Sequence, residues 1–424
     1  MTSKHASRHP ADLAHASQRA RLAPAMAGLL ASLFTCQAQA QQSPYYAGAA
    51  VTVHRDSNLF RAAKGAVVEG DTYTATGLRL GLDQSFGRQR LAASLDSNVN
   101  RFSRHKELNN TDYALSTQFD WSTLERLSGV VSAGARQSLY RYDRDSTQQF
   151  TDRNIQRSRN LGLQVQLGVV TDLSFDAGVS ASQDRYSAPS FANRNVNQVS
   201  TNVGLRARPG SGLTVRLGLR HSNGRYPNAS AATDDRTKRD DVDLSAVIEA
   251  SGASTLNARL SRTRQGHSLA GQTDSRGWTG GLGWNWRPTG KLSIDLNLGR
   301  DYALGSTGFD NQIVSLTSSD TRVQNSTGLR INWEASANWR VASSLSYAHR
   351  TLDNRLDSGV TTGTVLTATD RTAAFSLGLR YLPMRNVELG CNIGREDRST
   401  DTASTITFGY AVTTASCFGQ VYLR

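Results

Sequence analysis

Polar and apolar residues alternate along much of this chain. In the stretch SRNLGLQVQLGVV (residues 158–170), the apolar residues Leu161, Leu163, Val165, Leu167 and Val169 are separated by Gly162, Gln164, Gln166 and Gly168. The same period of two recurs at residues 199–206, 213–220, 242–249 and 292–299. This period predicts β-strands that have one apolar and one polar face. Helical periodicity is absent, so the sequence predicts an all-β protein.

The connections between these strands are asymmetric. Short turns are predicted near Gly87, Glu125, Asp172, Gly210, Gly252, Thr289, Ala335 and Met384, and longer polar loops at 142–157, 223–236, 303–320 and 352–367. This spacing gives about 18 strands, within a range of 16–18. Short connections at one end and long ones at the other are typical of transmembrane barrels. We therefore predict an antiparallel up-and-down transmembrane β-barrel, with a soluble β-sandwich as the alternative.

Aromatic residues fall near the predicted strand ends, on the apolar face. Those close to the short turns are Trp121, Trp284, Trp286, Trp333, Trp339 and Tyr381, and those toward the long loops are Tyr113, Trp278 and Tyr347. Such placement is expected of the two aromatic girdles at the membrane interfaces. The alternative is a set of scattered core aromatics in a soluble sheet.

The first 40 residues resemble a secretory signal peptide. Arg19 and Arg21 precede the apolar run AMAGLLASLFTC, and Ala38-Gln39-Ala40 forms a small-residue cleavage site. The predicted mature barrel is then residues 41–424, in the bacterial outer membrane. Cys36 follows the apolar run and raises the alternative of a lipoprotein, although Leu33-Phe34-Thr35 fits that processing poorly.

Two cysteines remain in the predicted mature chain, Cys391 and Cys417. Both share the outward parity of the last two strands, which are neighbours in a meander. In an exported protein this pair predicts one disulfide bond, and two reduced thiols are the alternative.

The polar face of the strands is rich in arginine. A Gly-Leu-Arg motif recurs at 77–79, 204–206, 218–220, 328–330 and 378–380, always with Leu outward. The predicted lumen-lining and solute-binding residues are Arg79, Arg206, Arg216, Arg220, Arg259, Arg330, Arg340 and Arg380, with the carboxylates Asp120, Asp176, Asp295 and Glu388. They either select a passing solute, as charged rings do in pores, or form ion pairs that bridge neighbouring strands. A barrel of 16–18 strands usually leaves an aqueous channel.

The sequence carries no catalytic signature. No histidine stands in a zinc-ligand spacing, and neither a phosphate-binding loop nor a nucleophile elbow is present. We predict no enzyme activity, no cofactor, no metal site and no nucleic-acid binding. The formal charge of the whole chain is +13, and it falls to +10 when Lys4, Arg8, Arg19, Arg21 and Asp12 of the predicted signal peptide are removed. This charge favours anionic partners, among them outer-membrane lipid, the phosphates of lipopolysaccharide and acidic polymers.

Three segments carry a resemblance to a known family. They are YYAGAAVTVHRDSNLFR (residues 45–61), TATGLRLGLDQSFGRQRLAASLDSNVNRF (residues 74–102), and the end of the chain from CNIGRED to ASCFGQVYLR. In these the sequence resembles the EpsL-type outer-membrane barrels of exopolysaccharide biosynthesis, within the broader group of β-barrel porins. The resemblance implies a part in making or exporting an extracellular polysaccharide, with other export proteins as partners. It brings no catalytic residues.

Three hypotheses for function follow. The leading one is a channel that passes or guides polysaccharide through an arginine-lined lumen. The second is a general or sugar-specific diffusion porin. The third is a structural or surface-anchoring barrel whose lumen is plugged.

Overall fold

The structure is a computed structural model of the 424-residue chain. It describes residues 43–124, 126–140, 142, 150–168, 172–228, 234–268, 274–302, 321–356, 364–401 and 407–423. The chain divides into two units, residues 1–43 and residues 44–424. The predicted signal peptide with Cys36, the turn residue Glu125 and Val169 lie outside the described residues.

Eighteen strands and two short 3-10 helices make up the second unit. The strands are β1 (Tyr45–Asp56), β2 (Asp71–Phe86), β3 (Gln89–Phe102), β4 (Asn110–Ser122), β5 (Leu127–Leu139), β6 (Ile155–Leu167), β7 (Leu173–Tyr186), β8 (Val196–Gly210), β9 (Leu213–Tyr226), β10 (Asp235–Ser251), β11 (Ser254–His267), β12 (Ser275–Thr289), β13 (Leu292–Asp301), β14 (Thr321–Glu334), β15 (Trp339–Leu356), β16 (Thr364–Met384), β17 (Val387–Thr400) and β18 (Tyr410–Leu423). The helices are η1 (Lys106–Leu108) and η2 (Pro189–Arg194).

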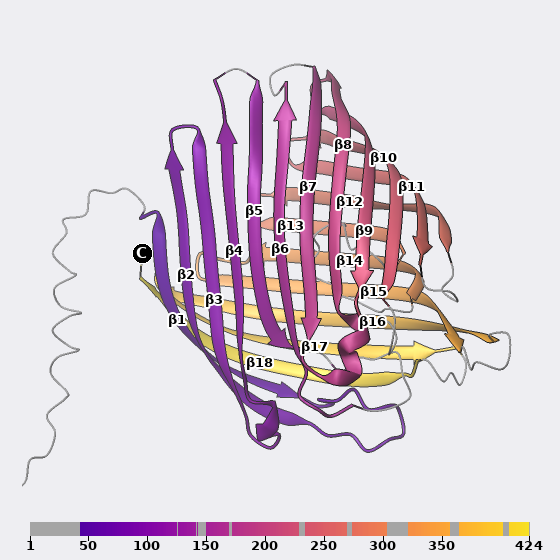
Figure 1. Cartoon of the computed structure of the whole chain (residues 1–424). Helices are drawn as coiled ribbons and strands as arrows, with labels where there is room; N and C mark the ends of the chain where they lie inside the picture. Colours follow the sequence, from indigo (N-terminus) through magenta and orange to yellow (C-terminus); the bar gives the residue numbers. More distant parts are fainter. Residues whose placement is uncertain are drawn as a thin grey trace, which may run out of the picture. The chain divides into compact units, whose positions relative to one another are not determined.

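Each strand pairs antiparallel with its neighbours in the sequence, and β1 pairs with β18 to close the sheet. Strands of opposite walls cross one another in projection, as tilted staves of a barrel do (Figure 1). Closure gives every strand a partner on both edges, which a sheet needs in order to cross lipid. The predicted 18-stranded antiparallel barrel is confirmed.

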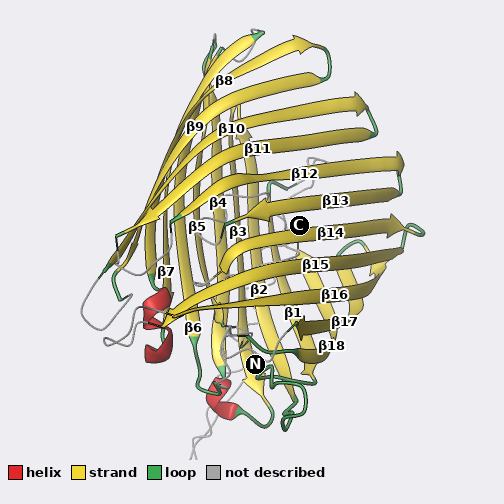
Figure 2. Ribbon diagram, turned by 90° about the vertical axis from the view of Figure 1, so that its right-hand side faces the viewer, coloured by secondary structure: helices red, strands yellow, loops and turns green. Residues whose placement is uncertain are grey.

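The predicted short turns near Gly87, Gly210, Gly252, Thr289, Ala335 and Met384 are confirmed, at one end of the strands (Figure 2). Gly212, in the turn between β8 and β9, has a φ of +88°, a conformation that side-chain-bearing residues rarely adopt. At the other end the strands run further than predicted. β9 continues to Tyr226 and β10 begins at Asp235, so both strands extend into the predicted loop 223–236. Polar residues above the membrane can stay paired because water solvates both of their faces.

Four strands carry a bulge next to a short turn, and proline occurs in three of these bulges. Register shifts occur at Ala207/Gly210, Trp286/Thr289 and Tyr381/Met384, and each interval contains a proline: Pro209, Pro288 and Pro383. Because proline lacks an N–H group, it fits a strand only where the ladder is interrupted. The bulges therefore set the point at which these hairpins turn.

The outward face of the barrel is apolar. Exposed leucines form a row across four paired strands: Leu205, Leu217, Leu244 and Leu260. Trp284 stacks on Trp286, and Trp339 packs on Tyr381, near the short turns. A closed barrel whose large apolar side chains face outward is the structure expected of a β-sheet protein that spans a lipid bilayer. The chain is therefore an outer-membrane β-barrel, as predicted. In the described part of the chain, no helix is long and apolar enough to span a membrane.

The two cysteines form a disulfide bond. Cys391 of β17 lies directly opposite Cys417 of β18 in the sheet register, with a Cα–Cα distance of 4.0 Å. The bond connects the last two strands on the outward face, next to the β18–β1 pairing that closes the barrel. It fixes the register of the closing hairpin.

Candidate functional site

One wall of the inner face carries several arginines in ion pairs. Arg216 of β9 reaches across two strands to Asp176 of β7, with Nη2 to Oδ2 at 2.6 Å and Nε to Oδ1 at 2.9 Å. A side chain at Gly204 or Gly218 would collide with the Arg216 guanidinium. The glycines of the Gly-Leu-Arg motifs at these positions therefore leave the space in which an arginine lies flat along the wall.

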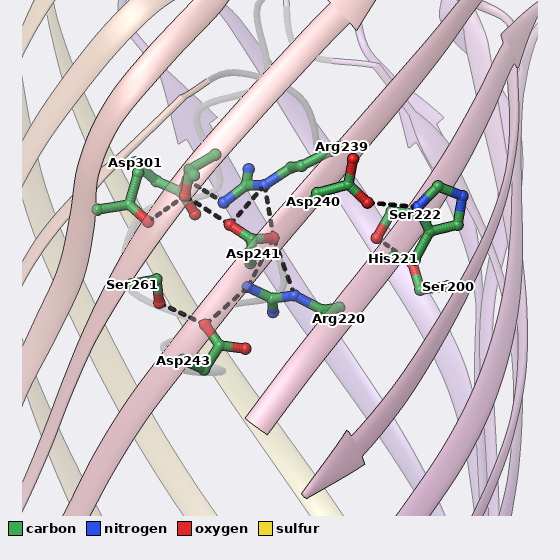
Figure 3. Close-up of polar contacts among 12 residues, drawn as sticks. Ser200, Arg220, His221, Ser222, Arg239, Asp240, Asp241, Asp243, Ser261 and Asp301 are labelled. Carbon is green, nitrogen blue, oxygen red and sulfur yellow. Dashed lines mark hydrogen bonds and ion pairs between the residues drawn. The ribbon is translucent and has the colours of Figure 1, made fainter. Parts of the chain in front are cut away.

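A cluster of charged residues occupies the same wall closer to the long loops (Figure 3). We call Arg220, Arg239, Asp241, Asp243 and Asp301 the aspartate–arginine cluster. Asp241 lies 3.0 Å from Arg220 and 2.9 Å from Arg239, whose other end contacts Asp301 at 2.9 Å. Arg239, Asp241 and Asp243 are buried, whereas Arg220 and Asp301 are partly exposed.

Hydroxyl groups complete this cluster. Ser261 donates to Asp243, and Thr263 donates to Asp241. Positive and negative charges in the cluster are thus paired with one another, within β10 and between β10 and the strands β9 and β13. For Arg216 and Arg220 the structure favours bridging ion pairs over contact with a solute.

Other predicted lumen residues form looser pairs, in the middle of the strands for Arg79 and near the short turns for Arg340 and Arg380. The nearest nitrogen–oxygen distances are 3.7 Å for Arg79 with Asp96, 3.5 Å for Arg340 with Glu334, and 3.2 Å for Arg380 with Glu388. The Arg340 and Arg380 side chains are half exposed, so these pairs contribute little to stability. Asp120 and Asp295 instead accept hydrogen bonds from the amides of Gln118 and Asn285.

Three predicted lumen arginines have no carboxylate partner among the described residues. Arg206 makes one long contact of 3.4 Å to Gln166, and the Nε of Arg259 is buried without a hydrogen-bond partner. No ion pair or side-chain hydrogen bond joins Arg330 to another described residue, although Asp295 lies opposite it in the register. These three guanidinium groups are available to an anionic solute.

A cavity of about 550 Å³ lies between β1–β5 and β15–β18, toward the long loops, and we call it the loop-end cavity. A row of directly paired inward residues crosses its wall: Asn392, Ser416, His54, Tyr73 and Phe102. The three rings stack in sequence, with centroids 4.5 Å apart for His54 and Tyr73 and 4.6 Å for Tyr73 and Phe102. The row is polar at one end and aromatic at the other.

The segment Asp56-Ser57-Asn58-Leu59-Phe60-Arg61 folds over this cavity. Asn58 donates to the carbonyl oxygens of Ala62 and Ala411 at 3.0 and 3.1 Å, which ties the loop to the start of β18. Leu59 and Phe60 are buried against a cluster formed by Phe102, Leu108 and Tyr142. The loop thus places Arg61 at the cavity wall.

Several polar groups of the loop-end cavity are uncommitted. Arg61 donates through Nη1 to Asp56 at 2.9 Å, yet its buried Nε has no hydrogen-bond partner. The side chains of His54, Asn392 and Ser416 make no hydrogen bond to another described residue. Buried or half-buried polar groups normally find partners, so this row offers donors and acceptors to a solute.

The phenol of Tyr142 contributes a neutral donor beside the same cavity. Burial raises the pKa of Tyr142 above its usual value, with the nearby Asp152 acting in the same direction. The hydroxyl donates to the Asp152 carbonyl oxygen at 3.0 Å.

Within the described residues, no three His, Cys, Asp or Glu side chains are grouped to hold a metal ion.

Sequence reasoning missed the loop-end cavity. None of His54, Asn392 and Ser416 was predicted to line a binding site, and the segment 56–61 was noted only for a resemblance. Nothing local shows that these residues lie in one row, because their register depends on barrel closure.

No family model and no curated protein matches the chain. Similar solved structures include OpdO of Pseudomonas aeruginosa, at 13% identity and a TM-score of 0.46, covering 89% of this chain and 97% of that one. They also include the outer membrane protein OpdK of Pseudomonas aeruginosa, at 11% identity and a TM-score of 0.48, covering 89% and 99%. The FrpB iron transporter of Neisseria meningitidis follows at 8% identity and a TM-score of 0.46, covering 89% and 81%. The resemblance to EpsL-type barrels stays a prediction.

Proposed function

We propose that this barrel is a channel for small hydroxyl-rich solutes, namely sugars and sugar acids, which bind transiently in the loop-end cavity. The observation that carries the proposal is the row of uncommitted polar groups at His54, Asn392 and Ser416 beside the free Nε of Arg61. Sugar hydroxyls both donate and accept, which suits a wall of amide, hydroxyl and imidazole groups. A carboxylate on the sugar would pair with the guanidinium of Arg61.

The size of the cavity fits this class of solute. A volume of about 550 Å³ lies within the range of small-molecule sites. Tyr73 and Phe102 give one end of the row an apolar surface, against which the C–H groups of a sugar ring can pack.

Planar-bilayer recording with added glucose or glucuronate tests the proposal. We expect an ion current through the wild-type channel that falls with sugar concentration. The double variant Asn392→Ala/Ser416→Ala should weaken the apparent sugar affinity roughly 10-fold, because each lost hydrogen bond is worth about 0.5–1.5 kcal/mol. The matched control is Asn297→Ala/Ser326→Ala, which removes the same two groups from the lumen face of β13 and β14. Absence of a current, or equal sugar affinities in both variants, would overturn the proposal.

Export of an extracellular polysaccharide is the second candidate. It is supported by Arg206, Arg259 and Arg330, which lie nearer the short turns than the loop-end cavity does. The guanidinium groups of these three residues have no carboxylate partner among the described residues. A chain of sugar acids is long enough to contact both these arginines and the loop-end cavity, whereas a single sugar contacts one region at a time.

Deletion of the gene separates the candidates. Polymer retained in the periplasm would favour export, and polymer that is secreted but no longer adheres to cells would favour surface anchoring. Unchanged polymer with reduced uptake of small sugars would favour the diffusion channel.

A further inference from the structure

A groove of about 540 Å³ lies along β8–β12, and most of the residues that line it face outward. Two rows of directly paired outward residues line it. The lower row is Val203, Leu219, Val242 and Arg262, followed by Trp278, and the upper row is Thr201, His221, Asp240, Arg264 and Arg276.

The two rows span the boundary between lipid chains and headgroups. Immediately below them lies the exposed leucine row that ends at Leu260, and immediately above Asp240 along β10 comes Lys238. Trp278 is 55% exposed, and the Arg262 guanidinium lies 5.4 Å from its ring centroid. Tryptophan with arginine at this height is typical of the interfacial belt.

The groove carries an excess of positive charge. Arg262, Arg264 and Arg276 are exposed and make no ion pair with a described residue. The one carboxylate in the outward rows, Asp240, pairs with the Nδ1 of His221 at 2.6 Å (Figure 3). Three guanidinium groups on two adjacent strands are therefore left for an anion that arrives from the membrane side.

We infer that this groove binds the phosphate groups of the outer-leaflet glycolipid, lipopolysaccharide. Guanidinium groups bind phosphate oxygens in bidentate fashion, and two neighbouring arginines match one phosphate group better than isolated lysines do. The acyl chains of the same lipid lie along Val203, Leu219 and Val242, directly below the arginines. The groove opens at the end that carries the long loops, which is the outer leaflet in barrels of this kind.

Native mass spectrometry of the purified barrel with lipid A tests the inference. We expect the wild type to retain lipid A, and the triple variant Arg262→Gln/Arg264→Gln/Arg276→Gln to bind it more weakly by on the order of 100-fold, given the typical contribution of each basic residue near a lipid surface. The matched control is Arg101→Gln/Arg157→Gln/Arg159→Gln, which removes the same charge from outward positions on β3 and β6. This control should retain most of the binding.

A second variant tests the sign of the electrostatic effect. Asp240→Asn removes the one negative charge of the outward rows, so it should bind lipid A several-fold more tightly than the wild type. All these side chains face lipid or water, so we expect the variants to fold. The heat-modifiable gel shift checks the folding of each variant.

Three results would overturn the inference. The first is equal binding of lipid A by the two triple variants, and the second is equal binding of dephosphorylated lipid A by the wild type. The third is phosphatidylglycerol binding as tight as that of lipid A, which would assign the groove to any anionic lipid.

Discussion

Replacing Asp241 by asparagine should destabilise the barrel, because it removes the charge at the centre of the aspartate–arginine cluster. The Asp241 residue is 2% exposed, and its side chain accepts hydrogen bonds from Arg220, Arg239 and Thr263. Asparagine has nearly the same shape, so the substitution changes charge without opening a cavity. Breaking a buried ion pair in this way costs about 3–5 kcal/mol. Arg239 keeps Asp301 at 2.9 Å and Arg220 keeps Asp243 at 3.4 Å, so we expect about 3 kcal/mol, at the lower end.

Reversible urea unfolding of the barrel in lipid vesicles, followed by tryptophan fluorescence, measures this free energy. The control is Asp83→Asn, which breaks the pair of Asp83 with Arg90. Both of these side chains are more than half exposed, so this variant should unfold like the wild type. If Asp241→Asn lowers the unfolding free energy no more than Asp83→Asn does, the aspartate–arginine cluster does not stabilise the wall and the prediction is wrong.

Two further predictions concern the closing hairpin and the lipid-facing surface. The double variant Cys391→Ser/Cys417→Ser, with a sequence separation of 26 residues, should lose about 3 kcal/mol of unfolding free energy. A reducing agent should lower the stability of the wild type to the same value, and an unchanged midpoint in that reagent would show that the two strands are not covalently joined. Leu244→Arg places a charge in the middle of the lipid-facing leucine row and should cost about 2–4 kcal/mol in vesicles, whereas Gln118→Arg on the lumen face should cost much less. Equal losses for these two variants would contradict the assignment of faces.

The membrane faces and the strand count could be predicted from the sequence because both depend on local information. Alternation of residues such as Leu213, Thr214, Val215 and Arg216 sets which side chains share a face, whatever the strand pairs with. Turn positions follow from breaks in that alternation, so the short turns that the structure describes were predicted correctly. The ends of the strands at the loop side were misplaced, since residues there are polar on both faces and show no alternation.

The charges of the lumen were predicted as residues but not as contacts. Arg216 and Arg330 both have inward parity in the sequence. Arg216 nevertheless pairs with Asp176, whereas Arg330 has no ion-pair partner among the described residues. The two arginines differ because β7, two strands away from β9, places Asp176 within reach of the Arg216 guanidinium group.

The sequence by itself determined which side chains face lipid and which face the lumen, because the pleat of a β-strand fixes that choice residue by residue. Only the tertiary structure decided which of them meet. Barrel closure pairs β1 with β18 and so puts His54 beside Ser416 and Asn392, more than 330 residues away along the chain. Likewise, the register of β9–β12 puts Arg264 and Arg276 in one row with His221 and Asp240. Register is set by hydrogen bonding between strands and by the stagger that closes the barrel, and no single strand contains that information.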